Sequence, residues 1–541
     1  MHGGVRYLEK AVFQLDYGQF KLVFEALHER RNLLRNAPHL VHALPIATPC
    51  YHLWEVPYYW AGMKAYDLVA GLSGLTMSRF CNAAESLAMF PTMAVVRGDD
   101  GASLKGTIVY QDGQFDDARL NVALACTAAH AGATVANYCR VTRLVKDDDG
   151  RVVGVRVQDV SGGGGGDGGG TAVGEEFEVR AKVVLNATGP FTDGVRRMSS
   201  GPDKKGIMTP AGGVHVTLPG YFAPHATGLI VPKTKDGRVV FMLPWLGAVI
   251  AGTTDAVAPI TLRPRATVEE VDSILEELAP YLSVPATRAD VTSAWAGIRP
   301  LAADPTADPT STENILRDHI VVDEGDGMVT VTGGKWTTYR LMAEHAVDAA
   351  ITAADRGRTG GGSYATTSGE ARGTTALAAK ATPCRTVAVA VVGSHGYSPD
   401  LSVRLAQSQP RSDGARTSSS ISSDGGGEIG VMRHLARSYG DRAPVVAQLA
   451  SSSALGALGN RLVPGHPVIA AEVVYAARHE YCQTTCDFIA RRTRLAFLDV
   501  EAAEAALPAV TALLAEELGW GVGRAAQELT DAKQFLTTFR V

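Results

Sequence analysis

The chain has 541 residues, of which 46% are hydrophobic and 20% are charged, and its formal net charge is −5. This composition is typical of a globular protein with at least two domains, and the negative balance gives no electrostatic case for nucleic-acid binding. No apolar run reaches the ~18 residues that a bilayer span needs. The seven cysteines form no CxxC pair, which favours free thiols in a reducing compartment.

The first 160 residues predict helices and short strands in alternation. Apolar residues recur at helical spacing in 19–36, and Pro38 ends that helix. The aromatic segment 53–72 is interpreted as a core helix, because Lys64 and Asp67 interrupt it; a helix in a membrane interface is the alternative. The other elements expected here are a helix at 117–131 and strands at 108–110, 134–136, 141–145 and 152–157.

The middle of the chain predicts one parallel strand and an antiparallel sheet. Segment 182–186 is almost continuously apolar, as a buried parallel strand is, and it runs into Ala187-Thr188-Gly189. Alternating patterns predict strands at 176–180, 211–218, 238–243, 248–254, 291–299 and 319–322, and a helix at 268–279 with Thr267 as its N-cap.

A nominal GxGxxG motif occurs at Gly164, Gly166 and Gly169. A dinucleotide fingerprint needs a strand before it and a helix after it, and this motif lies in a polyglycine tract. We therefore interpret it as a low-complexity loop.

The segment 328–340, MVTVTGGKWTTYR, has the pattern of a strand, a glycine pair and a helix. The first N–H groups of such a helix lack partners within it, and the helix dipole favours anions there. The glycines at 333–334 let a ligand approach the main chain, and Lys335, Thr337 and Thr338 add donors. The pattern predicts a site for an anionic or electron-rich group; an ordinary glycine turn is the alternative.

The last third of the chain predicts helices separated by tracts rich in glycine, serine and threonine. The tracts are 356–374 and 408–427, and the helices are expected at 431–439, 470–492 and 500–518. His479, Cys482 and Cys486 fall near one face of the middle helix, where core packing is the preferred interpretation because no second pair of metal ligands exists. We therefore expect no metal site.

Taken together, several motifs make the chain resemble the FAD-dependent glycerol-3-phosphate dehydrogenases of the mitochondrial, eukaryotic type. The stretches that carry the resemblance include HGGVRYLEKA, EALHERRNLL, PYYWAGMKAYDLVAG, YQDGQFDDARLNVAL, VLNATGPFTD, GGVHVTLPGY, FMLPWLGAVIAGTTD, WAGIRPL, GGKWTTYR and RRTRLAFLDVEAAEAALP.

The resemblance implies an α/β fold in which a doubly wound, Rossmann-like FAD-binding domain carries an antiparallel substrate-binding sheet and precedes an all-helical C-terminal domain. The corresponding boundaries are 1–354 for the oxidoreductase domain, with its substrate-binding part at about 205–300, and 430–541 for the helical domain. Between them, 355–429 is expected to be a flexible linker region with a short ordered piece at about 385–407.

The resemblance also implies oxidation of glycerol 3-phosphate to dihydroxyacetone phosphate, with hydride transfer to FAD and electrons passed to a membrane quinone. Such an enzyme is a peripheral protein of the mitochondrial inner membrane. A glycerol-3-phosphate oxidase that uses oxygen and an inactive, truncated flavoprotein remnant are the alternatives. The sequence has no calcium loop, so the calcium-binding tail of animal members is not expected.

The resemblance assigns roles to particular residues, and the chemistry of their side chains agrees. Arginine forks suit a phosphomonoester, and a histidine can accept a hydroxyl proton because its pKa can lie near working pH. The expected catalytic residues are His215 and Arg299, although a core histidine and a surface ion-pair arginine are the structural alternatives. The expected substrate-binding residues are Arg6, Tyr7, Lys335 and Thr338. The expected FAD-binding residues are His2, Gly3, Gly4, Val141, Ala187, Thr188, Gly189, Gly334, Lys335, Trp336 and Thr337.

One departure from the family pattern concerns the start of the chain. Members open with a strand, a GxGxxG loop and a helix before the HGG motif, and here Met1 stands directly before that motif. We therefore expect the sequence to lack the phosphate-binding segment together with any transit peptide, and FAD binding by the chain alone to be weak.

Overall fold

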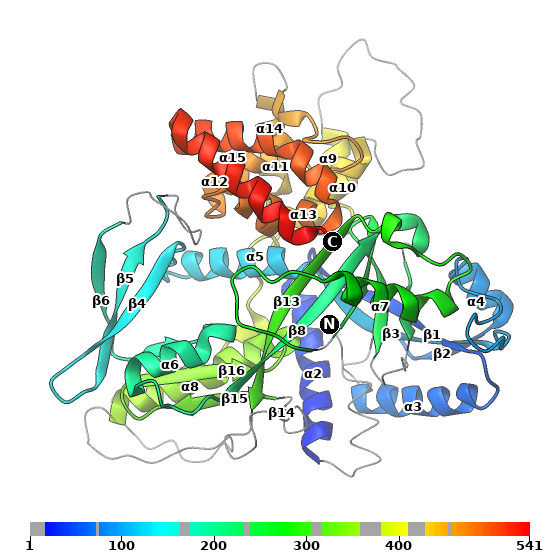
Figure 1. Ribbon diagram of the computed structural model, residues 1–541, viewed down its shortest axis with the longest axis horizontal. Coiled ribbons are helices and arrows are strands. Elements are labelled where there is room, and N and C mark those ends of the chain that lie inside the picture. Colours follow the sequence, from blue (N-terminus) through cyan, green and yellow to red (C-terminus); the bar gives the residue numbers. More distant parts are fainter. Residues whose placement is uncertain are drawn as a thin grey trace.

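The computed structural model describes residues 17–71, 75–162, 174–224, 226–231, 239–254, 256–303, 315–316, 318–356, 380–408, 428–452 and 457–541. The C-terminal helices gather at one end of the molecule, and a large sheet and two small sheets lie beneath them (Figure 1). None of the helices in these ranges is both long and apolar enough to cross a membrane.

The large sheet has ten strands in the order β14-β13-β8-β11-β10-β9-β1-β3-β2, with β12 paired to β8. Its strands are β1 (Val41–Cys50), β2 (Arg79–Asn82), β3 (Gly106–Phe115), β8 (Met208–Leu218), β9 (Gly228–Val231), β10 (Val240–Trp245), β11 (Ala248–Gly252), β12 (Ala256–Val257), β13 (Ser293–Ala303) and β14 (Ile315–Leu316). Neighbouring strands are antiparallel except β1 and β9. The expected antiparallel substrate sheet is therefore present.

Helix α7 (Val268–Leu278) covers one face of this sheet and fixes which side chains of β8 face the other way. A capping box starts the helix, since Thr267 accepts from Glu270 N–H and Glu270 accepts from Thr267 N–H, which confirms the predicted N-cap. Apolar residues of α7 form one core with Val214, Val216 and Leu218 of β8. Because side chains alternate along a strand, the odd-numbered residues of β8 point to the opposite face.

The second sheet is small and partly parallel, with the order β15-β16-β7. It comprises β15 (His319–Asp323), β16 (Met328–Gly333) and β7 (Val184–Asn186), and α6 (Thr192–Ser200) and α8 (Tyr339–Arg356) pack against it. Strands β7 and β16 run parallel, as the pattern of 182–186 predicted. The prediction that this strand is buried on both faces is wrong for Leu185, which is 43% exposed.

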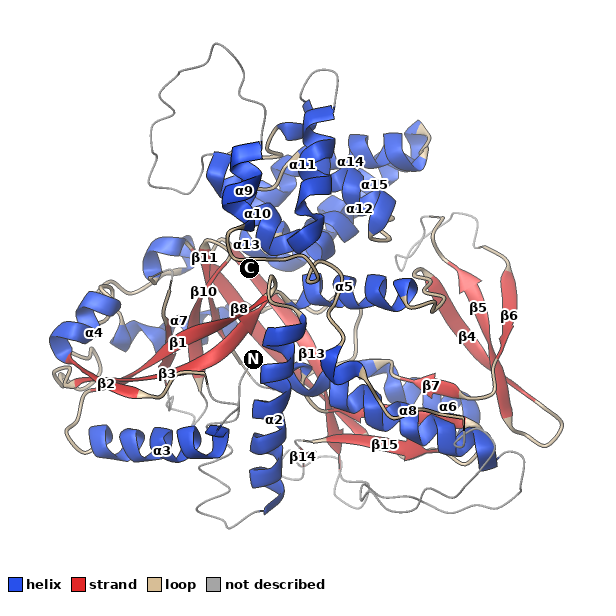
Figure 2. Cartoon of the chain, turned by 180° about the vertical axis from the view of Figure 1, so that it is seen from behind, coloured by secondary structure: helices blue, strands red, loops and turns tan. Residues whose placement is uncertain are grey.

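The third sheet is an antiparallel meander of β4 (Cys139–Lys146), β5 (Val152–Asp159) and β6 (Glu176–Arg180), and it projects from the side of the molecule (Figure 2). A strand expected at 134–136 is absent, because these residues form an irregular connection into β4. The discounted GxGxxG motif lies outside the described residues.

The helices that flank the sheets in the described part of residues 17–130 are α2 (Tyr17–Asn36), α3 (Glu55–Ala70), α4 (Ala83–Met89) and α5 (Asp117–His130). Helix α2 ends at the predicted residue. Helix α3 buries Met63 and Tyr66, but the interpretation of its aromatic residues as core is wrong, because Trp54, Tyr58 and Trp60 are exposed.

The C-terminal helices have cores of their own. They are α9 (Leu401–Ser408), α10 (Glu428–Tyr439), α11 (Ala443–Ser452), α12 (Ala470–His479), α13 (Leu495–Leu498), α14 (Val500–Leu518) and α15 (Val522–Leu536). The single helix expected at 470–492 is broken after His479, because the carboxylate of Asp487 accepts from the N–H groups of Gln483 and Thr484 and starts a new turn. No cluster of three metal-ligating side chains occurs among the described residues.

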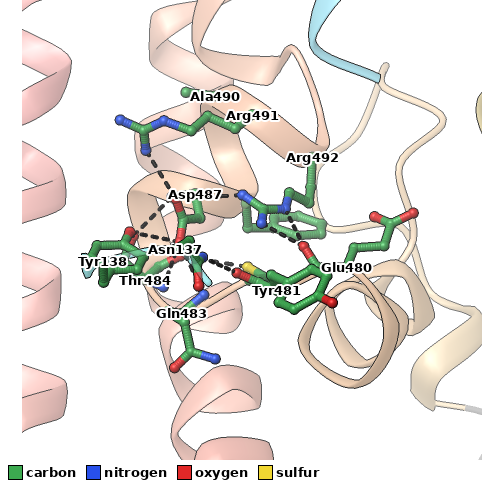
Figure 3. A network of polar contacts seen from close by, with 12 residues as sticks. Asn137, Tyr138, Glu480, Tyr481, Gln483, Thr484, Asp487, Ala490, Arg491 and Arg492 are labelled. Atoms are coloured by element: carbon green, nitrogen blue, oxygen red, sulfur yellow. Dashed lines mark hydrogen bonds and ion pairs between the residues drawn. The ribbon is translucent and has the colours of Figure 1, made fainter. Parts of the chain in front are cut away.

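Polar contacts attach the helical domain to the connection between α5 and β4. Tyr138 donates to Asp487 over 2.7 Å, and Asn137 donates to the carbonyl of Tyr481 over 2.8 Å (Figure 3). Nearby, Arg119 of α5 forms two 2.7 Å bonds to the carboxylate of Glu480, and both side chains are buried. The helical domain is therefore held to α5 and the following connection by polar contacts, among them a buried ion pair.

Candidate active site

His215, Trp295 and Arg299 project from the face of the large sheet that α7 does not cover. His215 of β8 pairs directly with Trp295 of β13, and Arg299 pairs with Ala211. All of these residues therefore share one face, because directly opposed residues of an antiparallel pair point the same way. The rings of His215 and Trp295 stack with centroids 4.6 Å apart and planes 19° apart.

Glycines on the same face leave room for these side chains. A Cβ on Gly213 would lie 2.2 Å from the guanidinium of Arg299, and a Cβ on Gly252 would lie 2.7 Å from the ring of His215. At Gly297, the register partner of Gly213, a Cβ would meet nothing within 4 Å. The guanidinium of Arg299 thus lies across β8, beside open space over Gly297.

The Arg299 guanidinium is fixed by oxygen atoms at the end of β11. It donates to the hydroxyl of Thr253 over 2.8 Å and to the carbonyl of Thr254 over 3.3 Å. Thr253 was not among the residues expected at the site. The pattern that could have identified it is the pair of threonines directly after β11. These contacts hold the guanidinium over the sheet.

A first prediction tests this placement of Arg299. Gly213→Ala should leave the chain folded, because the obstructing atoms belong to the far end of a flexible side chain, but it should displace the guanidinium. Losing part of a charge-assisted contact should raise KM for a phosphorylated substrate about tenfold. Steady-state kinetics measure the effect, and Gly194→Ala in α6, where a Cβ meets nothing within 4 Å, is the control. An unchanged KM would mean that the substrate does not contact Arg299 in this position.

The electrostatic surroundings of His215 differ from the sequence expectation. Burial, and then the charge of Arg299, lower the pKa of His215 to about 3, whereas a pKa near working pH was expected. The imidazole is therefore neutral at working pH and can accept a proton. A bound anion would offset the charge of Arg299, so it would raise the pKa of His215 and make protonation of the ring easier.

The carboxyl ends of β7 and β16 form the second part of the site. The strands are parallel and pair at Asn186 and Thr330, so Ala187-Thr188-Gly189 and the turn after Gly333 lie at the same sheet edge. Ligands of open α/β sheets bind at such an edge. Strand β13 connects the two parts, because its far end packs against β16 and against η2 (Gly189–Phe191).

The polar groups at this edge fit a flavin nucleotide. In η7 (Trp336–Thr338) the first hydrogen bond of the turn is donated by Thr338 N–H to the carbonyl of Lys335. The N–H groups of Trp336 and Thr337 come before it in the chain, so they have no acceptor within the turn. Just after β7, the hydroxyl of Thr188 donates to the buried side chain of Asn186. Donors at a helix start and an exposed sheet edge are what an electron-rich ring and its polar substituents require.

The glycine pair has a structural role in the turn. Gly333 and Gly334 have φ values of +78° and +73°, which favour glycine. A Cβ on Gly333 would overlap Ala302, and a Cβ on Gly334 would overlap Met342. The absence of side chains here therefore serves the turn and its packing against protein. That a ligand approaches the main chain at Gly334 stays a prediction.

The remaining expected site residues divide into three groups. Lys335 is the half-buried N-cap of η7, and Thr338 is buried behind it. Val141 lies in β4, on the projecting sheet. His2, Gly3, Gly4, Arg6 and Tyr7 lie outside the described residues.

Family comparisons agree with this geometry. A family model described as "FAD dependent oxidoreductase" matches residues 1–340, and one described as "C-terminal domain of alpha-glycerophosphate oxidase" matches residues 384–525. The chain is 49% identical over its full length to the mitochondrial glycerol-3-phosphate dehydrogenase SDP6 of Arabidopsis thaliana, of which it covers 79%. The chain belongs to the FAD-dependent glycerol-3-phosphate dehydrogenases.

Other relatives support the same family and its fold. The chain is 44% identical to the mitochondrial glycerol-3-phosphate dehydrogenase of Bos taurus, over 99% of the chain and 67% of that protein. The solved glycerol-3-phosphate dehydrogenase of Bacillus halodurans, complexed with FAD, superposes with a TM-score of 0.68 at 24% identity, over 94% of this chain and 84% of that one. The predicted fold class, the FAD cofactor and the oxidoreductase assignment are confirmed.

Proposed function

We propose that the chain oxidises glycerol 3-phosphate to dihydroxyacetone phosphate, with His215 as the base and Arg299 as a phosphate ligand. The observation that supports this proposal most strongly is the placement of a neutral histidine and a fixed guanidinium on one sheet face, beside open space over Gly297. A phosphomonoester needs a fixed cation, and an alcohol that is oxidised must lose its hydroxyl proton to a base.

The roles of the residues follow from this arrangement. Arg299 would hold the phosphate, and Lys335 would add positive charge from the edge of the parallel sheet. His215 would accept the hydroxyl proton while the carbonyl of dihydroxyacetone phosphate forms. FAD, when bound, accepts the hydride that leaves the central carbon. The N–H groups of Trp336 and Thr337, with Ala187, Thr188 and Gly189, would hold the cofactor, and Val141 is a further proposed contact.

Arg299→Ala tests the substrate assignment. A charge-assisted bond to phosphate contributes ~1.5–3 kcal/mol, so kcat/KM for glycerol 3-phosphate should fall about ten- to a hundredfold. Oxidation of glycerol, which has no phosphate, should change little in the same variant. An equal loss on both substrates would show that Arg299 does not bind the phosphate. The FAD absorbance of each preparation serves as the control for cofactor content.

The electron acceptor is proposed to be a membrane quinone, and the location a mitochondrial membrane. The mitochondrial relatives support the compartment. Reduction of a quinone analogue by the FAD-loaded enzyme should greatly exceed oxygen uptake at equal glycerol 3-phosphate. The opposite ratio would favour the alternative function of a glycerol-3-phosphate oxidase.

Helix α3 supports peripheral contact with a membrane. Its outward side carries Trp54, Tyr58, Trp60 and Leu68, with Trp54 62% and Leu68 83% exposed. The helix lies at the end of the molecule opposite the C-terminal helices, in both views (Figures 1 and 2). Exposed tryptophan and tyrosine beside aliphatic residues suit the interface between lipid headgroups and acyl chains.

A third prediction follows for membrane binding. Replacing both tryptophans (Trp54→Ser with Trp60→Ser) should strongly reduce co-sedimentation with phospholipid vesicles and leave flavin reduction by glycerol 3-phosphate unchanged. Val522→Ser removes an apolar side chain that is 90% exposed on α15 and should bind vesicles normally. Normal sedimentation of the double variant would place the membrane contact elsewhere.

A further inference from the structure

The ring of His215 is oriented by packing. Its Nδ1 atom is buried and has no hydrogen-bond partner among the described residues. One side of the ring stacks on Trp295, and Gly252 approaches so closely that a Cβ there would overlap the ring. The only charged side chain that affects its pKa among the described residues is Arg299 of β13.

Trp295 is in turn held by the C-terminal domain. Phe497 of α13 meets the Trp295 ring edge-on, with centroids 5.0 Å apart and planes 76° apart. The ring of Phe539 packs against that of Phe497, with centroids 4.8 Å apart. The guanidinium of Arg494 lies 4.5 Å from the Phe497 ring centroid. Trp295, although part of β13, packs against the hydrophobic core of the C-terminal helices.

Hydrogen bonds fix the segment that carries Phe497 to the ends of β8 and β13. The carbonyls of Ala496, Phe497 and Leu498 accept, in order, from the hydroxyls of Ser293 (2.9 Å), Thr217 (2.6 Å) and Thr292 (2.6 Å). Thr217 and Ser293 are each two residues from the stacked pair and are buried. Three successive carbonyls held in this way allow the segment little freedom relative to His215.

We propose that Trp295, clamped by Phe497, is a positioning residue that fixes the plane of His215 and keeps water from its stacked side. The C-terminal helical domain thereby completes the active site. This inference rests on the proposed function in that His215 is taken as the base. It adds that a residue about 280 positions later in the chain helps to set the rate of proton removal.

The test uses the full chain loaded with FAD and four variants. Trp295→Ala removes the stacked ring, Trp295→Phe keeps a ring, and Phe497→Leu loosens the clamp without touching His215. Phe535→Leu is the control, because Phe535 packs on the same core and its ring lies 5.2 Å from that of Phe539. Among the described residues, no ring contact joins Phe535 to His215 or Trp295.

Two measurements are made on each variant. The first is the rate at which diethyl pyrocarbonate modifies His215, followed by mass spectrometry of the peptide, which does not require turnover. The second is kcat and KM for glycerol 3-phosphate. For Trp295→Ala we expect faster modification, a fall in kcat of about tenfold or more and a nearly unchanged KM, since a misplaced base slows chemistry more than binding. Phe497→Leu should show smaller changes of the same kind. Trp295→Phe should have a modification rate and a kcat close to those of the wild type.

The outcomes separate this inference from the proposed function. If the FAD-loaded wild-type chain does not oxidise glycerol 3-phosphate, the proposed function fails, and the modification rates still decide whether Trp295 and Phe497 shield His215. If Trp295→Ala and Phe497→Leu modify and turn over like Phe535→Leu, the positioning role is overturned. A loss of kcat in Phe497→Leu that only follows a loss of bound FAD would overturn it as well.

Discussion

His215→Asn should lower kcat for glycerol 3-phosphate by about 10²- to 10⁴-fold, the usual contribution of a positioned general base. Bound FAD and KM should change little, because the asparagine removes the proton acceptor while Arg299 keeps its contacts with Thr253 and Thr254. Stopped-flow bleaching of the flavin measures the reductive half-reaction alone. The residual rate should rise with pH, as hydroxide replaces the missing base.

His42→Asn is the matched control for this experiment. His42 lies on β1 of the same sheet, and among the described residues its ring bonds only to Gln114, on the surface and away from β8. Its loss should leave flavin reduction at the wild-type rate. Equal losses in the two variants, or a His215→Asn enzyme with normal reduction, would show that His215 is the core histidine of the structural alternative.

The lowered pKa of His215 adds a pH signature to the same prediction. Since the ring is neutral above about pH 3 in the free protein, His215 should cause no loss of kcat/KM as pH falls from 8 to about 5. A bound phosphate would offset the charge of Arg299 and raise the pKa of His215 in the complex. The acid limb of kcat should therefore lie at higher pH than the acid limb of kcat/KM.

Local patterns in the sequence predicted most of the elements around the site. The alternation along β8 and β13 and the cap at Thr267 lie within single elements, so spacing and side-chain type are sufficient to predict them. Strand β1 was not predicted, because Pro45 and Pro49 weaken the strand pattern, yet both are accommodated in its pairing with β3.

Contacts between distant segments were not predicted from local patterns. Nothing in WAGIRPL shows that Trp295 packs against Phe497, because that contact depends on how a separate helical domain docks. The same is true of Glu480, which lies inside the single helix predicted at 470–492 and in the structure follows α12, buried against Arg119 of α5. The roles of His215 and Arg299 came from family resemblance, and the structure adds their shared sheet face and the glycines beneath them.

Arg119→Leu should destabilise the attachment of the C-terminal domain by about 3–5 kcal/mol, because it leaves the carboxylate of Glu480 buried without its partner. The guanidinium also donates to the carbonyl of Ser438 and lies 4.4 Å from the Tyr439 ring centroid, so packing is lost with the charge. Urea unfolding followed by limited proteolysis measures the effect, as the helical domain should be released at a lower urea concentration than in the wild type.

Two further variants decide whether the buried charge is the cause. Arg478→Leu breaks a pair with Glu517 that has similar distances, 2.6 and 2.7 Å, but leaves the Arg478 side chain 50% exposed, so it should cost ~1 kcal/mol or less. The double variant Arg119→Leu with Glu480→Leu removes both charges and should recover much of the lost stability. If docking of the helical domain orients His215 through Phe497, flavin reduction should be slow in Arg119→Leu under mild urea. The rate should recover in the double variant. Stability that recovers without the rate would show that docking and proton removal are independent.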